Sequence, residues 1–598
     1  MKSPSVRRRH VFSIVSFALF IAAGTADARI EYRISLTQPE KHLFHVEMNV
    51  PATADQRDLV IALPAWNALY QVRDFAYRVR DVRVVEAPGI AASVTPSKLD
   101  KQTWRVPASA ATNGAIHVEY EITWDEAGPF NSQLNTHHAF VNFAEVLMYV
   151  PDRRAEETEV KFTDVPSDWR SIAELPAGSE PDSFAAASYD KLVDAPVEIG
   201  KFEEFDFDNG GAHFRVVLDS REGSRTMLED SLKRITGYEM KLMGGPPFKE
   251  YTFFFHIGPF PEVGGGGMEH ANCTAIGASS TEMAIGIAAH EFFHLWNVKR
   301  IRPQSLEPVD YTKEQYSHAL WFAEGVTSTY GSFTLERSSI WSKDKWYTDL
   351  AQQVCELESR PAHKWQSVDE SSLDTWFDKY DAYNLPERSI SYYNKGQIIG
   401  DMLDLAIRGA TDNHKSLDDV LRSLNEAAKQ GKFYDESAGI RVVVEEVSGK
   451  SFEDFFARYV SGLDEIPYDQ FLVYAGLALK SEARRSADPG FYATRSAEGP
   501  VVAGVTPGSA AQTAGLRADD LLLELNGMPI SGRIAAWMRE RTPGETIKVK
   551  IRRGGEEREL AFAMGSREEN RCSIVEVAHP TEKQLRARKG LLNVRREL

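Results

Sequence analysis

The chain has 598 residues and a formal net charge of −18, with 87 acidic side chains against 69 basic ones. This length is too great for a single compact core, so we expect two to four domains. The acidic balance argues against nucleic acid or an anionic membrane surface as a partner, because both favour clustered Lys and Arg.

The first 28 residues have the layout of a secretory signal peptide. Three arginines, Arg7 to Arg9, precede the apolar run VFSIVSFALFIAA, and Ala26-Asp27-Ala28 provides a small-x-small cleavage site. We therefore expect a periplasmic or secreted protein without stable membrane association after cleavage. An uncleaved N-terminal anchor is the alternative interpretation, and Arg8-Arg9 also loosely fits a twin-arginine signal.

Residues 29–219 predict an N-terminal β domain. In IHVEYEITW every second residue is apolar, as in a strand with one buried face: Ile116, Val118, Tyr120, Ile122 and Trp124. The runs RISLTQPEKHLFHVEMNV and DLVIALPAW look similar, and Pro, Gly, Asn and Asp separate them. This pattern predicts a β-sandwich-like domain.

Residues 220–480 predict a domain of helices with one small sheet. YTFFFHIG predicts a short strand, and GGGGMEH, Gly264 to His270, follows it. Helical spacing of apolar residues then dominates Glu282 to Val298, WFAEGVTSTYGSFTLER and GQIIGDMLDLAIRG.

Residues 481–570 resemble a PDZ domain of the bacterial type, on the residues TPGSAAQTAGL, Asp519-Asp520 and Asn526-Gly527. The resemblance covers about Pro489 to Met564 and implies a module that could hold the C-terminus of a peptide. The tail, residues 571–598, has no interpretable pattern.

The chain has three cysteines, Cys273, Cys355 and Cys572. An odd and sparse set predicts no disulfide framework, even in an exported protein. We therefore expect stability to come from ordinary apolar cores.

The strongest chemical signal is HEFFH inside the apolar stretch AIGIAAHEFFHLWNVKRIRP, Ala284 to Pro303. On a helix, His290 and His294 project from one face one turn apart, so both neutral imidazoles can reach one Zn²⁺. Glu291 follows the first histidine, where it can take a proton from water without being a metal ligand.

Glu324 is the predicted third ligand. It lies in WFAEG, 30 positions after His294. A lone Glu in this context would be read as a capping or solvated residue, but beside HEFFH it completes a His₂Glu site with one open coordination position. We find no fourth protein ligand, which a closed structural site would need. The sequence therefore predicts one catalytic Zn²⁺ per chain.

Four features together resemble the glycyl aminopeptidase family of gluzincin metallopeptidases: HEFFHLWNVKRIRP, WFAEG, GGGGMEH and the PDZ-like region. The resemblance runs over most of the chain and implies a thermolysin-like α+β catalytic domain. It extends more distantly to the aminopeptidase N group, which shares His-Glu-x-x-His-x-Trp, here ending at Trp296. In that group the third ligand follows the second histidine sooner than Glu324 does.

The same resemblance implies a substrate-binding strand. Gly266, Gly267, Met268 and Glu269 match the Gly-x-Met-Glu-Asn strand of the aminopeptidase N group, with His270 in place of Asn. Glu269 would hold the free α-amine, and the glycines would let a peptide backbone approach closely. A flexible surface loop is the alternative interpretation of the glycine run.

The resemblance also implies an oxyanion donor. Tyr393 in YYNKG takes the place of the tyrosine in Tyr-x-Lys-Gly of the aminopeptidase N group. Tyr392 is a neighbouring candidate for the same role. The alternative interpretation is that Tyr393 is a tyrosine of the apolar core without a catalytic role.

These resemblances imply a zinc-dependent aminopeptidase that removes small N-terminal residues, such as Gly or Ala, from peptides. Glu291 would be the general base and Tyr393 the donor to the oxyanion. One alternative is a thermolysin-like endopeptidase in which Glu269 is only structural. Comparing the hydrolysis of peptides with free and with blocked N-termini would distinguish it from an aminopeptidase. The other is a catalytically inert adaptor that binds peptides through the PDZ domain, which zinc content and turnover would test.

Overall fold

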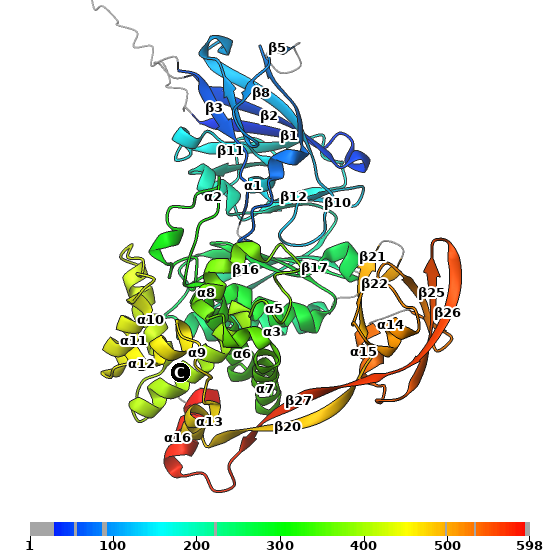
Figure 1. Ribbon diagram of the computed structural model, residues 1–598. Helices are drawn as coiled ribbons and strands as arrows, with labels where there is room; N and C mark the ends of the chain where they lie inside the picture. The colour runs from blue at the N-terminus through cyan, green and yellow to red at the C-terminus, as the bar shows by residue number, and fades with distance from the viewer. Residues whose placement is uncertain are drawn as a thin grey trace, which may run out of the picture.

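The computed structural model describes residues 29–592 except 53–56, 68, 87–91, 221–223, 497–498 and 531–533. The predicted signal peptide, residues 1–28, lies outside the described residues. Figure 1 shows a blue and cyan β domain, a green and yellow helical domain, and a small orange and red β domain. The predicted multidomain architecture is confirmed. Within the described residues, no helix has the length and apolar character needed to cross a membrane.

The N-terminal domain is built from sheets. In the described part of the chain their strand orders are β13-β11-β1-β2-β8-β4-β5, β12-β14-β10-β9 and β3-β7-β6. Burial alternates along β8, Ala115–Thr123, which pairs antiparallel with β2, Leu43–Pro51, as the apolar pattern predicted. The other elements are β1 (Ile30–Ser35), β3 (Leu59–Ala62), β4 (Val79–Val85), β5 (Ala92–Val94), β6 (Ser97–Lys98), β7 (Thr103–Val106), β9 (Gln133–Leu134), β10 (His138–Val141), α1 (Phe143–Val146), β11 (Thr158–Thr163), β12 (Arg170–Ala173), β13 (Ser183–Ala186), α2 (Tyr189–Val193) and β14 (Val197–Gly200).

The central domain begins earlier than predicted. β15, Glu203–Asn209, and β16, Ala212–Ser220, join β17, Glu250–Ile257, in a sheet of order β15-β16-β17-β19-β18. The change of sheet therefore lies near residue 201 and not at residue 219. Alternating burial predicts that a segment is a strand, but it cannot show which sheet the strand joins.

Both faces of β17 are buried. Phe253 and Phe255 belong to the core under the helices, whereas Phe254 packs with Phe140 of the N-terminal domain. The nearly continuous apolar run of this strand is typical of a sheet covered on both sides. The sheet is thus packed between the helices and the N-terminal domain.

Helices form the rest of the central domain. α5, Thr281–Phe293, packs against β19, Cys273–Ala278, and against α6, Thr327–Arg337. The π-helical segment η6, Trp321–Val326, runs into α6 and packs on α9, Tyr392–Ala410. The other helices are α3 (Arg225–Leu242), α4 (Phe260–Val263), α7 (Lys343–Ser359), α8 (Val368–Leu373), α10 (Leu417–Ala428), α11 (Gly439–Ser448), α12 (Glu453–Phe455) and α13 (Tyr468–Leu472).

The C-terminal β domain has a core of its own. A long antiparallel ribbon of β20, Leu477–Asp488, and β27, Gly565–Glu576, attaches it to the helical domain (Figure 1). Both predicted ends of the PDZ domain, residues 481 and 570, fall inside this ribbon. Its elements are β21 (Phe491–Ser496), β22 (Gly499–Val505), α14 (Ala510–Thr513), β23 (Leu521–Leu525), β24 (Met528–Pro529), α15 (Ile534–Arg539), β25 (Thr546–Arg553) and β26 (Glu556–Ala563).

The C-terminal segment returns to the helical domain. α16, Glu582–Leu592, buries Leu591 and Leu592 in the main core, and Arg588 Nε donates to Ala475 O at 2.8 Å. This part of the predicted tail is therefore structural. Its few apolar residues were too sparse to form a recognisable pattern.

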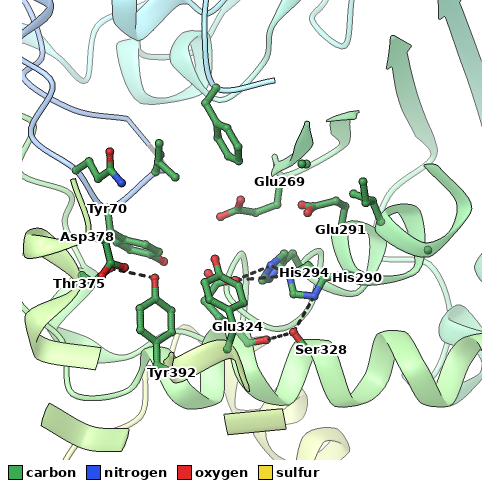
Figure 2. Close-up of a pocket in the computed structure, with 18 residues that line it drawn as sticks. Tyr70, Glu269, His290, Glu291, His294, Glu324, Ser328, Thr375, Asp378 and Tyr392 are labelled. Carbon is green, nitrogen blue, oxygen red and sulfur yellow. Dashed lines mark hydrogen bonds and ion pairs between the residues drawn. The ribbon is translucent and has the colours of Figure 1, made fainter. Parts of the chain in front are cut away.

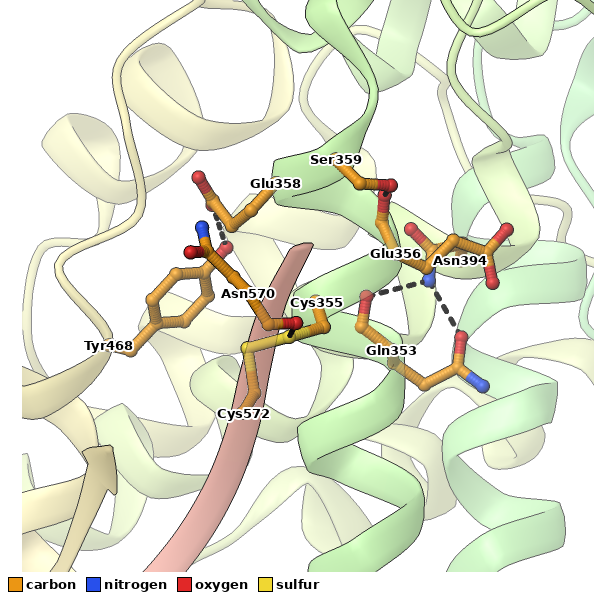
Figure 3. The surroundings of a disulfide bond; sticks show 9 residues. All are labelled: Gln353, Cys355, Glu356, Glu358, Ser359, Asn394, Tyr468, Asn570 and Cys572. Atoms are coloured by element: carbon orange, nitrogen blue, oxygen red, sulfur yellow. Dashed lines mark hydrogen bonds between the residues drawn. A yellow bond between two sulfur atoms is a disulfide. The ribbon is translucent and has the colours of Figure 1, made fainter. Parts of the chain in front are cut away.

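A disulfide joins α7 to the ribbon. Cys355 is bonded to Cys572 of β27 across 217 positions of sequence (Figure 3). The sequence predicted no disulfide framework, and a pairing this distant cannot be read from spacing. Cys273 is buried and free. The bond ties one strand of the ribbon to the helical domain.

Candidate active site

α5 presents the two histidines of the HEFFH motif. Ser280 caps the helix, and its Oγ accepts a hydrogen bond from Met283 N at 3.2 Å. His290 and His294 lie one turn apart, and their Nε2 atoms are 2.9 Å from each other. The helix therefore brings two imidazole nitrogens to one point, as the four-residue spacing predicted.

The other ring nitrogen of each histidine is also in contact. His294 Nδ1 lies 2.7 Å from Asn297 O, which places a proton on Nδ1 and leaves Nε2 to face the cavity. Asn297 Nδ2 donates to Phe322 O at 2.8 Å, which ties this turn to η6. His290 Nδ1 is 3.3 Å from Ser328 Oγ. These contacts orient both rings.

Glu324 of η6 completes the group. Its Oε2 lies 3.1 Å from His294 Nε2 and 3.6 Å from His290 Nε2. We call His290, His294 and Glu324 the cavity cluster. The π-helical turn is a rare local conformation that is frequent at functional sites.

A contact between two glycines positions η6. A Cβ on Gly325 would lie 2.5 Å from Gly396 Cα, and a Cβ on Gly396 would lie 2.5 Å from Trp321 O. A side chain at either position would force η6 and α9 apart. The glycines of WFAEG and YYNKG therefore allow the close packing that holds Glu324 under the histidines.

The cavity cluster has strongly shifted pKa values. Burial lowers the pKa of His294, but Glu324 outweighs burial and raises it to about 10. Although burial would raise it, the pKa of Glu324 lies well below its usual range because His294 and His290 are adjacent. Burial, helped by His294, lowers the pKa of His290. The cluster thus contains an ionised carboxylate that stabilises positive charge at the adjacent imidazoles, as it would stabilise a bound cation.

Glu291 lies beside the cavity cluster, next to the glycine strand. A Cβ on Gly267 would lie 2.3 Å from Glu291 Cγ, so the strand can approach this side chain only with glycine there. Glu291 is buried, and its Oε2 has no hydrogen-bond partner among the described residues. Burial, together with Glu269 and Glu324, raises the pKa of Glu291 to about 8. This carboxylate is therefore a ready proton acceptor.

The glycine run forms an edge strand. β18, Gly266–Glu269, pairs antiparallel with β19 at the end of the sheet. Gly266, Gly267 and Glu269 line the cavity, whereas the Met268 side chain is buried on the opposite face, as strand alternation requires. Of the four predicted substrate-binding residues, Met268 thus contributes no side chain to the cavity.

The turn after Glu269 is held by ion pairs. His270 Nδ1 lies 3.4 Å from Asp194 Oδ1, and Lys299 Nζ donates to the same oxygen at 2.7 Å. Asp194 Oδ2 also accepts from Ala271 N at 3.2 Å. Asp194 belongs to the N-terminal domain, so this turn is braced from outside its own sheet.

The two tyrosines of YYNKG have different surroundings. The Tyr392 side chain is buried, and its hydroxyl lies 3.0 Å from Thr375 Oγ1 (Figure 2). Tyr393 is 40% exposed, and its ring centroid is 6.2 Å from that of His290. Tyr393 is therefore the better placed of the two to act in the cavity.

The predicted site residues meet around one cavity of about 480 Å³. In Figure 2, Glu269 and Glu291 lie above the histidines, and Tyr70 lies on the side of Glu269 away from Glu291. The sequence analysis missed part of the wall, namely Leu69, Tyr70, Gln71 and Phe130 of the N-terminal domain and Thr375 and Asp378 of the helical domain. These residues belong to no motif, and only domain packing brings them to the cavity.

A second His₂Glu group lies between the N-terminal domain and β17. His138 Nδ1 is 2.8 Å from Glu198 Oε1, and His256 Nε2 is 2.9 Å from Glu198 Oε2. His138 Nε2 faces Gln133 Oε1 at 3.0 Å, and Gln133 Nε2 donates to Asp125 Oδ1, which fixes the orientation of the amide. His138 therefore donates from both nitrogens as an imidazolium. We call His138, Glu198 and His256 the interface cluster.

Comparison with protein families agrees with this architecture. Residues 283–399 match the M61 glycyl aminopeptidase model, residues 31–201 match the Peptidase M61 N-terminal domain, and residues 501–553 match a PDZ domain. The N-terminal match ends where the five-stranded sheet begins. No curated protein matches the chain.

One solved structure shares the fold over nearly the whole chain. The crystal structure of an aminopeptidase N family protein from Idiomarina loihiensis is 23% identical and has a TM-score of 0.78, over 94% of this chain and 100% of that chain. An M1 zinc metallopeptidase from Deinococcus radiodurans is 12% identical with a TM-score of 0.45, over 74% of this chain and 95% of that one.

The catalytic-domain match defines the chain as a metallopeptidase. The models that match its catalytic and N-terminal regions are those of the M61 glycyl aminopeptidase family, and a PDZ domain accompanies them. The resemblance seen in the sequence is thereby confirmed.

Proposed function

We propose that the protein is a zinc-dependent aminopeptidase that removes small N-terminal residues, such as Gly or Ala, from peptides. The placement of Glu269 carries the proposal. Glu269, Glu291 and His294 each offer an atom within 4.8 Å of the others in one cavity. A carboxylate on the edge strand, this close to the hydrolytic groups, suits a free α-amine one residue from the scissile bond.

The cavity cluster is the proposed zinc site, with one ion per chain. Two imidazole nitrogens and one carboxylate oxygen are the donors of a hydrolytic zinc site with an open position. The fit is supported by His294, whose Nδ1 is engaged by Asn297 O while Nε2 faces His290 Nε2. Bound Zn²⁺ would polarise the scissile carbonyl and lower the pKa of a coordinated water.

Glu291 is the proposed general base. It would take a proton from the attacking water and return it to the leaving amine. Its burial, its unpartnered Oε2 and its raised pKa support this role, because such a carboxylate binds a proton readily near neutral pH. Tyr393 is the proposed donor to the oxyanion, supported by its exposure beside His290.

Glu269 is the proposed anchor for the substrate's amine. An α-amino group has a pKa of about 7.7–8.0 and is largely cationic at neutral pH. A charge-assisted hydrogen bond to it contributes roughly 1.5–3 kcal/mol. The unpaired edge of β18 supports the binding of an extended peptide, and Gly266 and Gly267 leave its face free of side chains.

We further propose that the protein is exported, to the periplasm or beyond. The pattern of residues 1–28 and the disulfide between Cys355 and Cys572 support an oxidising compartment. The PDZ domain is proposed to hold peptide C-termini.

The decisive experiment compares free and blocked substrates. Alanine p-nitroanilide and its N-acetyl form are assayed with zinc-replete wild type, Glu269→Ala and the exposed control Glu282→Ala. We expect acetylation to abolish hydrolysis, and Glu269→Ala to lose at least about tenfold in kcat/KM, equal to 1.4 kcal/mol. Equal internal cleavage of free and acetylated peptides would favour the endopeptidase. Zinc-loaded protein without any turnover would favour the adaptor.

A further inference from the structure

The N-terminal domain supplies part of the cavity wall. Tyr70 and Phe130 line the cavity together with Glu269 of the central domain. Tyr70 is 9% exposed, and its ring packs against Trp66 at 6.4 Å and edge-on to Trp376 at 6.5 Å. Because Trp376 belongs to the helical domain, the Tyr70 ring is held at the junction of the two domains.

The loop of residues 127–131, here named the Phe130 loop, is held by hydrogen bonds from side chains to its backbone carbonyls. Arg73 Nη1 donates to Phe130 O at 2.7 Å and to the buried Glu145 Oε1 at 3.0 Å. Asn142 Nδ2 donates to Asn131 O at 2.6 Å and to Pro129 O at 3.2 Å. Arg73 and the buried Asn142 thus anchor three consecutive carbonyls, so the Phe130 ring stands on a rigid support.

The Phe130 loop packs against β18 and against Gly264, which precedes this strand. A Cβ on Gly264 would be 2.5 Å from Gly128 Cα, and a Cβ on Gly266 would be 3.1 Å from Phe130 Cε2. The strand and the loop are therefore in van der Waals contact, with glycine on the strand where they meet. Phe130 closes the space beside Gly266, three positions before Glu269.

We propose that Phe130, together with Tyr70, sets the size limit for the side chain of the substrate's first residue. The inference rests on the proposed function, in which Glu269 holds the amine and the cavity cluster lies at the scissile bond. A first residue held between these two points directs its side chain into the rest of the cavity, where the two aromatic rings form the wall. The N-terminal domain thereby determines substrate choice in a site whose chemistry belongs to the central domain.

The physical basis is steric. A rigid wall cannot relax to admit a larger side chain, and each extra methylene that clashes or fits changes discrimination by about 10–200-fold. Shortening Phe130 to Ala removes the ring but leaves the anchored carbonyls in place. Replacing it with Trp makes the same space smaller. The two changes should therefore shift substrate preference in opposite directions.

The test measures kcat and KM of the zinc-replete full chain for the p-nitroanilides of Gly, Ala, Leu and Phe. Phe130→Ala is expected to raise the ratio of kcat/KM for Leu over Ala by at least about tenfold. It should change kcat/KM for Gly by less than about threefold. Phe130→Leu should give an intermediate ratio, and Phe130→Trp should reduce activity on Ala more than on Gly. Tyr77→Ala, which removes a 71% exposed ring of the same domain, should leave all ratios unchanged.

Unchanged ratios in folded Phe130→Ala, in an enzyme active on free amines, overturn this inference and leave the proposed function standing. If Phe130→Ala does not fold, Phe130→Leu and Phe130→Trp decide, and unchanged ratios in both overturn it. A wild type that hydrolyses no free-amine substrate overturns the proposed function and this inference together.

Discussion

The part of the chain that the structure describes contains two groups of two histidines and a glutamate, and their surroundings differ. In the cavity cluster, two Nε2 atoms face each other at 2.9 Å beside a cavity of about 480 Å³. In the interface cluster, one ring nitrogen of each histidine lies at hydrogen-bond distance from a carboxylate oxygen of Glu198, between two packed sheets. One arrangement directs two Nε2 atoms at a common point beside a cavity, and the other fills both contacts with hydrogen bonds to Glu198. Ligand composition alone therefore does not define a metal site.

The largest expected difference between the two clusters is in the zinc content of their variants. His294→Ala and Glu324→Ala should each reduce zinc content and turnover to background, because three protein ligands leave no redundancy. His256→Ala should retain about one zinc per chain and its turnover, while losing about 3–5 kcal/mol of stability, typical of a broken buried pair. Metal analysis of the purified variants, with urea unfolding, provides the measurement. Loss of metal from His256→Ala would show that both groups bind cations.

The next test separates binding from chemistry within the cavity. Glu291→Gln should keep full zinc content and lose about 10²–10⁴-fold in kcat, because it removes a proton acceptor and no ligand. Metal analysis and steady-state kinetics on the same sample check both halves. The matched change Glu198→Gln, in the interface cluster, should leave kcat within a few-fold. A metal-free Glu291→Gln protein would place Glu291 in the coordination sphere.

The local parts of the site could be predicted from the sequence. His290, Glu291 and His294 come from one helical turn, so their spacing alone brings them together. Glu324 could be predicted because it stands in the short motif WFAEG, whereas the contact of its neighbour Gly325 with Gly396 is seen only in the structure.

The remaining parts depend on distant contacts. Tyr70 and Phe130 reach the cavity only because one domain packs on another, and neither stands in a motif. The interface cluster draws its members from three strands, β10, β14 and β17, and no spacing relates them. The same limit applies to Cys355 and Cys572, which meet across most of the catalytic and PDZ sequence.

The two clusters also differ in their aromatic neighbours. Tyr393 lies 6.2 Å from the His290 ring, and Phe140 lies 5.1 Å from the His256 ring. Tyr393→Phe should lower kcat by about 10²-fold with KM and zinc content little changed, because it removes a donor used in the transition state. Tyr392→Phe is the matched control and should have a much smaller effect. A larger effect at Tyr392 would reverse the assignment of the pair.

The interface cluster has an electrostatic signature of its own. Burial lowers the pKa of His138, but Glu198, with Asp219 and Asp125, outweighs burial and raises it above the usual value. Burial raises the pKa of Glu198, yet the two histidines bring it down to about 2. The Glu198 contribution to stability is therefore present above pH 4.5 and is lost as the pH falls towards 2.

The last and smallest expected effect is the pH dependence of stability on the alkaline side. Because the folded state raises the pKa of His138, its contribution is fully present below about pH 6.5 and is lost as the pH rises through the folded pKa. The free energy of unfolding in urea, measured from pH 6 to pH 9 on zinc-replete protein, should fall more steeply for wild type than for His138→Gln. The exposed His414→Gln serves as the control and should keep the wild-type slope. Parallel pH profiles for wild type and His138→Gln would show that His138 is not an imidazolium. The contact between His138 and Glu198 would then be a hydrogen bond from a neutral imidazole and not an ion pair.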